Sequence, residues 1–147
     1  MSTKKDISES KVEELTVRYE ATLNDPYQLV IHARGGISVD AFFDLLEISA
    51  FTRDELADLL DVSFKTISRY KKENKHLNVL NSEQILKLIR LYKHGTEVFG
   101  DLDAFNRWLR KPSHGLGNII PTELMRSSGG IDLIDEELSR IEYGSFG

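Results

Sequence analysis

The 147-residue chain is predicted to be all-α, with a helix-turn-helix domain followed by a second, smaller helical domain. Three observations predict this class. Apolar residues recur at helical spacing in nearly every periodic segment. No Asn-Gly or Asp-Gly pair stands between alternating apolar residues, which would signal a β-hairpin. Residues 51–70 read as two capped helices across a tight turn, a pattern typical of DNA-reading helix-turn-helix motifs.

The composition fits a globular chain. Hydrophobic residues make up 40% and charged residues 29%, which suits one domain or two small ones packed together. No run approaches the roughly 18 apolar residues that a membrane span needs, and the first residues lack the apolar block of a secretory signal. We therefore expect a cytoplasmic location and no membrane partner. The absence of cysteine excludes disulfides, thiol nucleophiles and thiolate metal sites.

Residues 1–37 form an N-terminal segment with a weak pattern. The first dozen residues are polar and are expected to fray. The apolar positions from Val12 to Tyr19 fit either a short strand or loose coil, ending near Pro26. A short helix is then predicted over 27–33, stopped by the pair Gly35-Gly36. The segment as a whole is interpreted as partly disordered, as a cap on the next domain, or as a dimerising element.

Residues 38–80 are assigned to the helix-turn-helix domain. A helix starting at Ser38 is expected to pack in front of the motif through apolar residues that suit a core or an oligomer interface equally: Val39, Phe42, Phe43, Leu45, Leu46 and Ile48. Thr52 and Glu55 then have the spacing of a capping box. Asp61 stands in the turn where such motifs commonly have Gly, and Asp tolerates left-handed backbone better than most residues. Ser63 is a natural N-cap for the next helix.

The second helix of the motif carries the candidate DNA-binding face. Val62, Ile67 and Tyr70 are expected to pack inward, which leaves a cationic arc outside. From Ser63 to His76 there are five cations against one anion, a local charge of +4 in a chain of net charge -5. The candidate DNA-binding residues are Ser63, Lys65, Thr66, Ser68, Arg69, Lys71, Lys72 and Lys75. The alternative is an amphipathic hairpin with a solvated basic face.

Residues 81–147 are assigned to the second helical domain. The spacing predicts a long buried helix opening at Asn81-Ser82, one from Asp101 or Asp103 ending before Pro112, a short one over 122–126 after Pro121, and a last one that follows a break at Gly129-Gly130. This end of the chain is acidic, because residues 127–147 hold five carboxylates against one cation, a local charge of −4. Two ends of opposite charge suggest different partners.

Enzyme and metal sites are not expected. The histidines His32, His76, His94 and His114 never fall at i,i+3 or i,i+4 spacing. Gly115 and Gly117 begin like a dinucleotide fingerprint, but its third glycine position is Ile120 and no strand precedes it. The consecutive carboxylates from Asp135 to Glu137 point in different directions around a helix and are read as a solvated face. No cofactor is expected.

An ordered set of motifs follows the helix-turn-helix: Val98-Phe99-Gly100-Asp101, Phe105-Asn106-Arg107-Trp108-Leu109, Ile120-Pro121-Thr122-Glu123-Leu124 and Arg140-Ile141-Glu142-Tyr143-Gly144. With these motifs the chain resembles an Xre/MbcA/ParS-type antitoxin from about Ser38 to Gly144. The resemblance implies a non-enzymatic, all-helical member of a type II toxin-antitoxin pair. Such a protein binds a cognate RES-type, NAD-directed toxin through its C-terminal domain and represses its own operon through the helix-turn-helix. Operator DNA and a homodimer, or a hetero-oligomer with toxin, are the implied partners.

Carried onto this chain, the toxin-binding candidates are Ile141, Glu142, Tyr143, Gly144 and Phe146. Trp108 and Leu124 match motif positions too, but their apolar neighbours indicate core. Glu142 suggests a mechanism in which a carboxylate occupies the toxin's cationic pyrophosphate pocket. The alternatives are a frayed tail without function, and a stand-alone transcriptional regulator whose C-terminal domain senses a ligand or dimerises.

Overall fold

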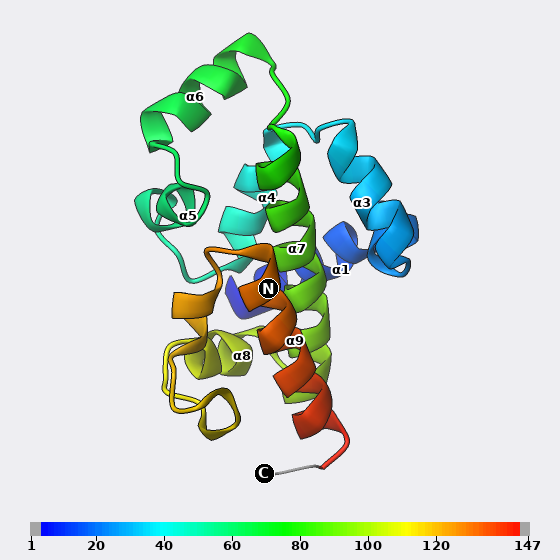
Figure 1. The fold of residues 1–147 in the computed structure, drawn as a ribbon, viewed down its shortest axis with the longest axis vertical. Coiled ribbons are helices and arrows are strands. Elements are labelled where there is room, and N and C mark those ends of the chain that lie inside the picture. The colour runs from blue at the N-terminus through cyan, green and yellow to red at the C-terminus, as the bar shows by residue number, and fades with distance from the viewer. Residues whose placement is uncertain (1–3, 145–147) are drawn as a thin grey trace.

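One long helix, α7 (Val79–Phe99), forms the axis of the molecule, and most of the other helices pack against it (Figure 1). The computed structural model describes residues 4–144, and within them the chain is helical with no strand, as predicted. The remaining elements are α1 (Lys4–Arg18), α2 (Glu20–Leu23), α3 (Pro26–Arg34), α4 (Asp40–Ile48), α5 (Arg53–Leu59), α6 (Phe64–Glu73), α8 (Leu102–Leu109), the 3-10 turns η1 (His114–Leu116) and η2 (Pro121–Leu124), and α9 (Ser128–Glu142).

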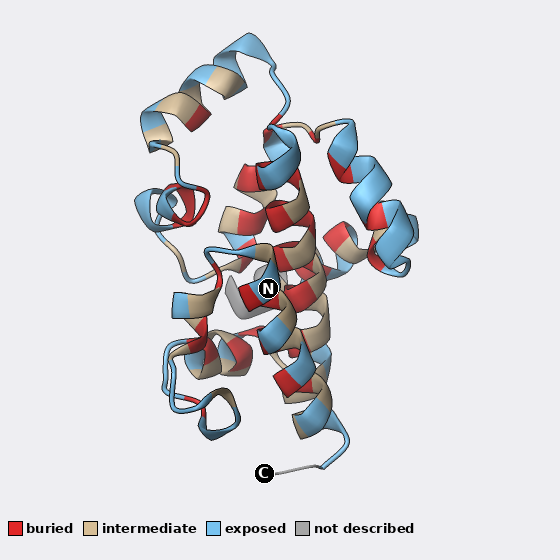
Figure 2. Cartoon of the chain, viewed as in Figure 1, coloured by how far each residue is buried: buried red, intermediate tan, exposed pale blue. Residues whose placement is uncertain are grey.

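The core follows α7 along its whole length, as the buried positions in Figure 2 show. At its C-terminal half, the ring of Tyr92 meets Phe105 of α8 edge to face with centroids 5.2 Å apart. Gly95 permits this contact, since a Cβ atom there would lie 2.3 Å from the Phe105 ring. Trp108 stacks on Phe105 at 6.1 Å and is half-buried against the core, in agreement with its assignment from sequence.

The N-terminal segment differs from the sequence prediction. Residues predicted as strand or coil are helical in α1 and α2, and the first three residues lie outside the described part of the chain. Val12 and Leu15 are buried, whereas Val17 is 66% exposed. The buried stripe of α1 is therefore narrow, and this explains why the apolar residues of the sequence show only a weak helical periodicity there. Ion pairs to α4 support the packing: Lys11 Nζ lies 3.1 Å and Arg18 Nη1 2.8 Å from the Asp44 carboxylate.

The short helix predicted over 27–33 is α3, which ends before Gly35, and the predicted helix after it is α4, which begins at Asp40 rather than at Ser38. Phe42 and Ile48 are fully buried within the chain, and Phe43 is half-buried beside them. In this chain these residues of α4 form part of the core.

Two predicted helix boundaries in the second half were wrong, and the short helix predicted over 122–126 is the 3-10 turn η2, which ends at Leu124. The long helix α7 begins at Val79 under an Asn78 cap rather than at Asn81. Asn81 is instead buried, and its Nδ2 donates to Leu60 O at 3.0 Å. The pair Gly129-Gly130 does not break a helix but lies in the first turn of α9. A Cβ atom on Gly130 would sit 1.8 Å from Leu124 O, so glycine is needed there for close approach.

Polar groups tie the helix-turn-helix to the second half of the chain. The buried Gln84 side chain on α7 donates from Nε2 to Leu59 O at 2.6 Å and to Met125 O at 3.0 Å. Arg110 donates to Glu55 Oε2 at 3.1 Å, and Arg126 donates to Asp58 O at 3.0 Å. The two halves are therefore joined through α5. Within residues 4–144, no helix combines the length and apolar character that crossing a bilayer requires.

Candidate functional site

N-terminal caps position α5 and α6, the two helices of the helix-turn-helix motif. Thr52 N donates to Glu55 Oε1 at 2.9 Å and Glu55 N to Thr52 Oγ1 at 3.1 Å, which completes the predicted capping box. The Thr52 amide, with help from Arg110, holds the pKa of the Glu55 carboxyl below its ordinary value. Asp61 takes the left-handed conformation that the turn requires, with φ 57°. Ser63 Oγ then accepts from Thr66 N at 3.1 Å and begins α6.

The inner side of α6 rests on α4 through aromatic rings. Ile67 is buried, and the Phe64 ring lies 6.2 Å from the centroids of both Phe42 and Phe43. Tyr70 is half-buried against the same core. These contacts fix which side of α6 faces outward, because side chains at helical spacing share one face. The inward set predicted from the sequence matches this arrangement.

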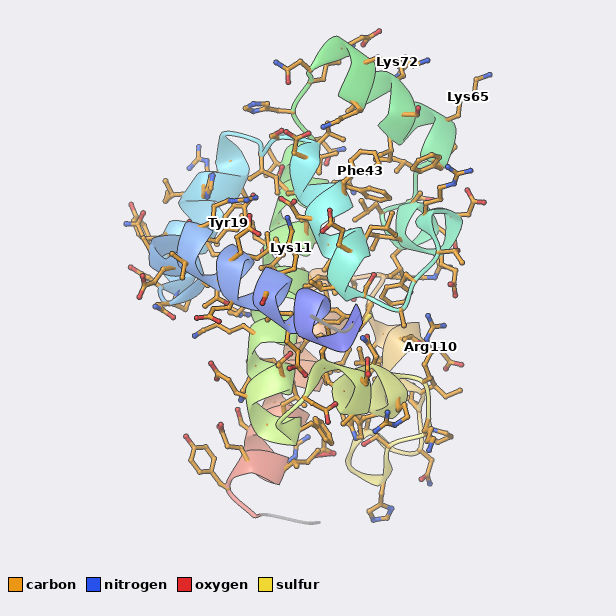
Figure 3. The ribbon with its side chains drawn as sticks, turned by 180° about the vertical axis from the view of Figure 1, so that it is seen from behind. Lys11, Tyr19, Phe43, Lys65, Lys72 and Arg110 are labelled. Carbon is orange, nitrogen blue, oxygen red and sulfur yellow. The ribbon has the colours of Figure 1, made fainter. Side chains whose placement is uncertain are left out.

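The outer side of α6 holds three unpaired cations. Lys65, Arg69 and Lys72 are exposed, and no ion pair within residues 4–144 involves any of them. Figure 3 shows Lys65 and Lys72 extending away from the body of the molecule. Thr66 and Ser68 lie half-buried between them. The face contains a hollow of about 660 Å³, lined by Asp54, Ser63, Phe64, Lys65, Thr66, Ser68, Arg69 and Lys72.

The other candidate DNA-binding residues have partners within the chain. Lys71 pairs with Asp40 of α4 and keeps the pKa of that carboxyl below its ordinary value. Lys75 Nζ lies 2.8 Å from Glu73 Oε2 and lowers the pKa of that carboxyl in the same way. Ser63 serves as the N-cap. The structure thus brings Lys65, Arg69 and Lys72 together on one face and directs Lys71 toward α4.

Two charged residues of α5 next to α6 were missed from the sequence. Arg53 Cζ lies 4.7 Å above the Phe64 ring, which places its guanidinium beside the start of α6. Asp54 lines the hollow with the opposite charge. The Thr52 cap was the available signal, because it fixes both residues in the first turn of α5.

The acidic end of α9 lies at the opposite end of the long axis from α6 (Figure 1). There His94 of α7 contacts two carboxylates of α9: Nδ1 lies 2.8 Å from Asp135 Oδ1 and Nε2 3.3 Å from Glu142 Oε1. The bond to Asp135, joined by that to Glu142, raises the pKa of His94 despite its partial burial. His94, Asp135 and Glu142 line a hollow of about 280 Å³, and Arg90 and Lys93 lie in its wall as well.

The consecutive carboxylates of α9 were read as a solvated face, and this was wrong for two of them. Asp135 is bonded to His94, and Glu137 is only 5% exposed, with Oε1 3.0 Å from Arg140 Nε. Glu136 alone is exposed. The tertiary contact with α7 and the close approach of the 3-10 turn at Gly115 account for the difference.

The candidate toxin-binding residues occupy the end of α9. Ile141 is half-buried, whereas the Tyr143 side chain is 81% exposed. Gly144 has φ 74°, a left-handed conformation, and its N donates to Ile141 O at 3.1 Å. Phe146 lies outside the described residues. His94 was missed as a contact of Glu142 because the two are 48 residues apart in sequence.

Nothing in residues 4–144 gathers His, Asp and Glu side chains into a group that could hold a metal ion.

Two family models match the chain. Residues 28–90 match the antitoxin Xre-like helix-turn-helix domain, and residues 94–144 match the antitoxin Xre/MbcA/ParS C-terminal toxin-binding domain. The second match includes His94, Asp135 and Glu142.

Similar proteins agree with these matches. An antitoxin Xre of Photorhabdus laumondii is 24% identical over 74% of each chain. A Prs ADP-ribosylating antitoxin of a Sphingobium species is 28% identical over 60% of this chain and 62% of its own length. A chain in the crystal structure of the M. tuberculosis MbcT-MbcA toxin-antitoxin complex shares the fold, with a TM-score of 0.57 and 19% identity over 74% of this chain and 96% of that chain. The protein belongs to the Xre/MbcA/ParS family of antitoxins, with an Xre-like helix-turn-helix ahead of the family's toxin-binding domain.

Proposed function

We propose that this antitoxin neutralises a RES-type, NAD-directed toxin by direct binding through its C-terminal domain, and represses its own operon through α6. In this proposal the chain acts as a binding protein without catalysis. The observation that carries it is the end of α9, where Glu142 and the exposed Tyr143 stand within the family's toxin-binding domain. The name of one relative, a Prs ADP-ribosylating antitoxin, connects the family with ADP-ribosylation, a reaction that consumes NAD.

The inhibitory step is assigned to Glu142. Its carboxylate lies at the last residue of α9, where Oε1 is 3.3 Å from His94 Nε2, and the Glu142 side chain is 37% exposed, which leaves it accessible to a cationic partner. A guanidinium or ammonium group that binds pyrophosphate would pair with this carboxylate through the same kind of charge-assisted hydrogen bond. Tyr143 beside it offers an aromatic anchor of the kind that dominates interface energetics.

The separation of the two ends supports a dual role. The cationic face of α6 and the acidic end of α9 lie at opposite ends of α7 (Figure 1), so one chain has room for DNA and toxin together. Opposite local charge also selects different partners at the two ends, because phosphate binding requires cations.

Co-purification from a bacterium that expresses the chain with the product of its neighbouring gene tests the proposal. An antitoxin should hold that product in a stoichiometric complex, and a stand-alone regulator should not. Glu142→Ala and Tyr143→Ala should each reduce toxin neutralisation in a growth assay. Glu136→Ala, which removes an exposed carboxylate elsewhere on α9, is the matched control and should neutralise normally. If deletion of residues 143–147 together with Glu142→Ala leaves neutralisation unchanged, inhibition comes from another surface of the domain.

A further inference from the structure

The outer face of α3 carries an apolar stripe that no part of the described chain covers. Tyr27 is 67%, Val30 46% and Ile31 41% exposed, while Leu29 and Ala33 on the opposite face are buried. Arg34 follows on the same stripe at i+7 from Tyr27 and is also exposed. Figure 2 shows the outer side of α3 as largely exposed surface. Contiguous exposed apolar residues on a helix face are a common feature of protein interaction surfaces.

The order of residues along the stripe is self-complementary. If two copies of α3 pack antiparallel about a two-fold axis between Val30 and Ile31, Val30 of one copy faces Ile31 of the other. Tyr27 then faces Arg34 of the second copy at both ends. A guanidinium over an aromatic face is a favourable pair, and a two-fold interface requires this reciprocity between the same two surfaces. Charge supports the same alignment, because Asp25 caps the N-terminus of α3 and Arg34 ends it.

We propose that the α3 stripe, defined as Tyr27, Val30, Ile31 and Arg34, is the surface through which two copies of this chain dimerise. The pairing is modest in size. A nine-residue helix is about 14 Å long, and a stable interface buries about 800 Å² on each partner. The α3 stripe alone supplies less, so the dimer dissociates on dilution.

Dimerisation through α3 would determine how the two α6 helices of the dimer are placed relative to each other. The loop that follows α3 is bonded to the segment that follows α6: Leu77 N donates to Ile37 O at 2.8 Å, and His76 Nδ1 lies 3.1 Å from Gly36 O. Movement of α6 relative to α3 is thereby restricted. A symmetric pair of α3 helices therefore presents two α6 helices in a fixed relation, which suits an operator with two half-sites. The inference deepens the DNA-reading role proposed above.

Sedimentation equilibrium of the full chain, with neither DNA nor toxin present, tests the surface separately from that role. The wild type should pass from monomer to dimer as concentration rises. Val30→Lys places two charges at the centre of the interface and should remain monomeric at concentrations where the wild type is dimeric. Val17→Lys, the same change at an exposed valine of α1, is the matched control and should dimerise normally. Equal thermal unfolding of the variants excludes misfolding.

A charge-exchange pair identifies the antiparallel alignment. Arg34→Glu and Tyr27→Lys should each weaken self-association, because each homodimer loses both end contacts. Mixed together they should form a heterodimer, which contains one original Tyr27 to Arg34 contact and one new Lys to Glu pair. A wild type that stays monomeric at the highest concentration overturns the proposal, as does a Val30→Lys variant that dimerises like the wild type. The proposal is also wrong if Val30→Lys leaves dimerisation intact but abolishes the toxin complex, because α3 would then be a toxin-binding surface.

Discussion

Nδ1 of His94 lies 2.8 Å from Oδ1 of Asp135, and this contact joins the axial helix α7 to the C-terminal helix α9. The bond connects residues 41 positions apart and lies at the end of the domain proposed to bind toxin. It also leaves the other ring nitrogen, Nε2, facing Glu142. One imidazole therefore orients two of the carboxylates of the acidic end.

The first prediction concerns pH. The carboxylates raise the pKa of His94 above its ordinary value of 6.5, so the folded state favours the protonated ring. The resulting stabilisation is complete below pH 6.5 and is lost as the pH rises through the raised pKa. His94→Gln should therefore lower the free energy of unfolding more at about pH 5.5 than at about pH 8.5. Urea unfolding at both pH values measures this.

The control for that experiment is His114→Gln, a change at an exposed histidine in the 3-10 turn η1. It should leave the pH dependence of the unfolding free energy as in the wild type. An equal loss of stability at both pH values in His94→Gln would show that the ring acts by packing alone.

The second prediction separates the cations of α6 in DNA binding. Arg69→Ala should weaken binding to the chain's own promoter DNA by about 1 to 3 kcal/mol, because Arg69 is exposed and lines the hollow on the outer face of α6. Lys71→Ala should have a smaller effect, since Lys71 is already paired with Asp40. Fluorescence anisotropy at fixed salt measures both variants, and toxin neutralisation should stay unchanged in each. Equal losses for the two variants would contradict the assignment of the face.

The third prediction concerns the turn before α6. Asp61 has φ 57°, a conformation that costs a non-glycine residue about 1 kcal/mol or more. Asp61→Gly should therefore stabilise the fold by up to about 1 kcal/mol, whereas Asp61→Ala should destabilise it, because alanine accepts the left-handed region less readily than aspartate. Thermal unfolding followed by circular dichroism distinguishes them. Stabilisation by alanine would mean that the turn changes conformation.

The fourth prediction compares adjacent glycines in the first turn of α9. Gly130→Ala would bring Cβ to 1.8 Å from the backbone oxygen of Leu124, so the helix must move, at a cost of about 1 to 3 kcal/mol or more. At Gly129 a Cβ atom meets nothing within 4 Å. Gly129→Ala should stabilise the helix by up to about 1 kcal/mol. Chemical unfolding should show a lower free energy of unfolding for Gly130→Ala and a higher one for Gly129→Ala. Changes of the same sign in both variants would refute the close contact at Gly130.

The sequence by itself determined the all-α class and the helix-turn-helix, because the signals that encode them are local. The capping box at Thr52 and Glu55, the Ser63 cap and the tolerance of Asp61 for its turn each depend on residues within a few positions of one another. Local pattern also predicted that Ile67 faces inward. The ordered C-terminal motifs are also local, since each is a run of consecutive residues, and they indicate the family without reference to the fold.

Only the tertiary structure decided the features that depend on distant partners. Helix α1 was missed because its buried stripe is too narrow to give a clear helical periodicity, and ion pairs to Asp44 of α4 contribute to its packing. Lys71 is an outward cation by sequence, but packing of α6 on α4 brings it to Asp40. Gly130 was read as a helix break, whereas contact with Leu124 makes it a site of close approach. Spacing along a chain determines which face a side chain occupies, and only packing determines what that face meets.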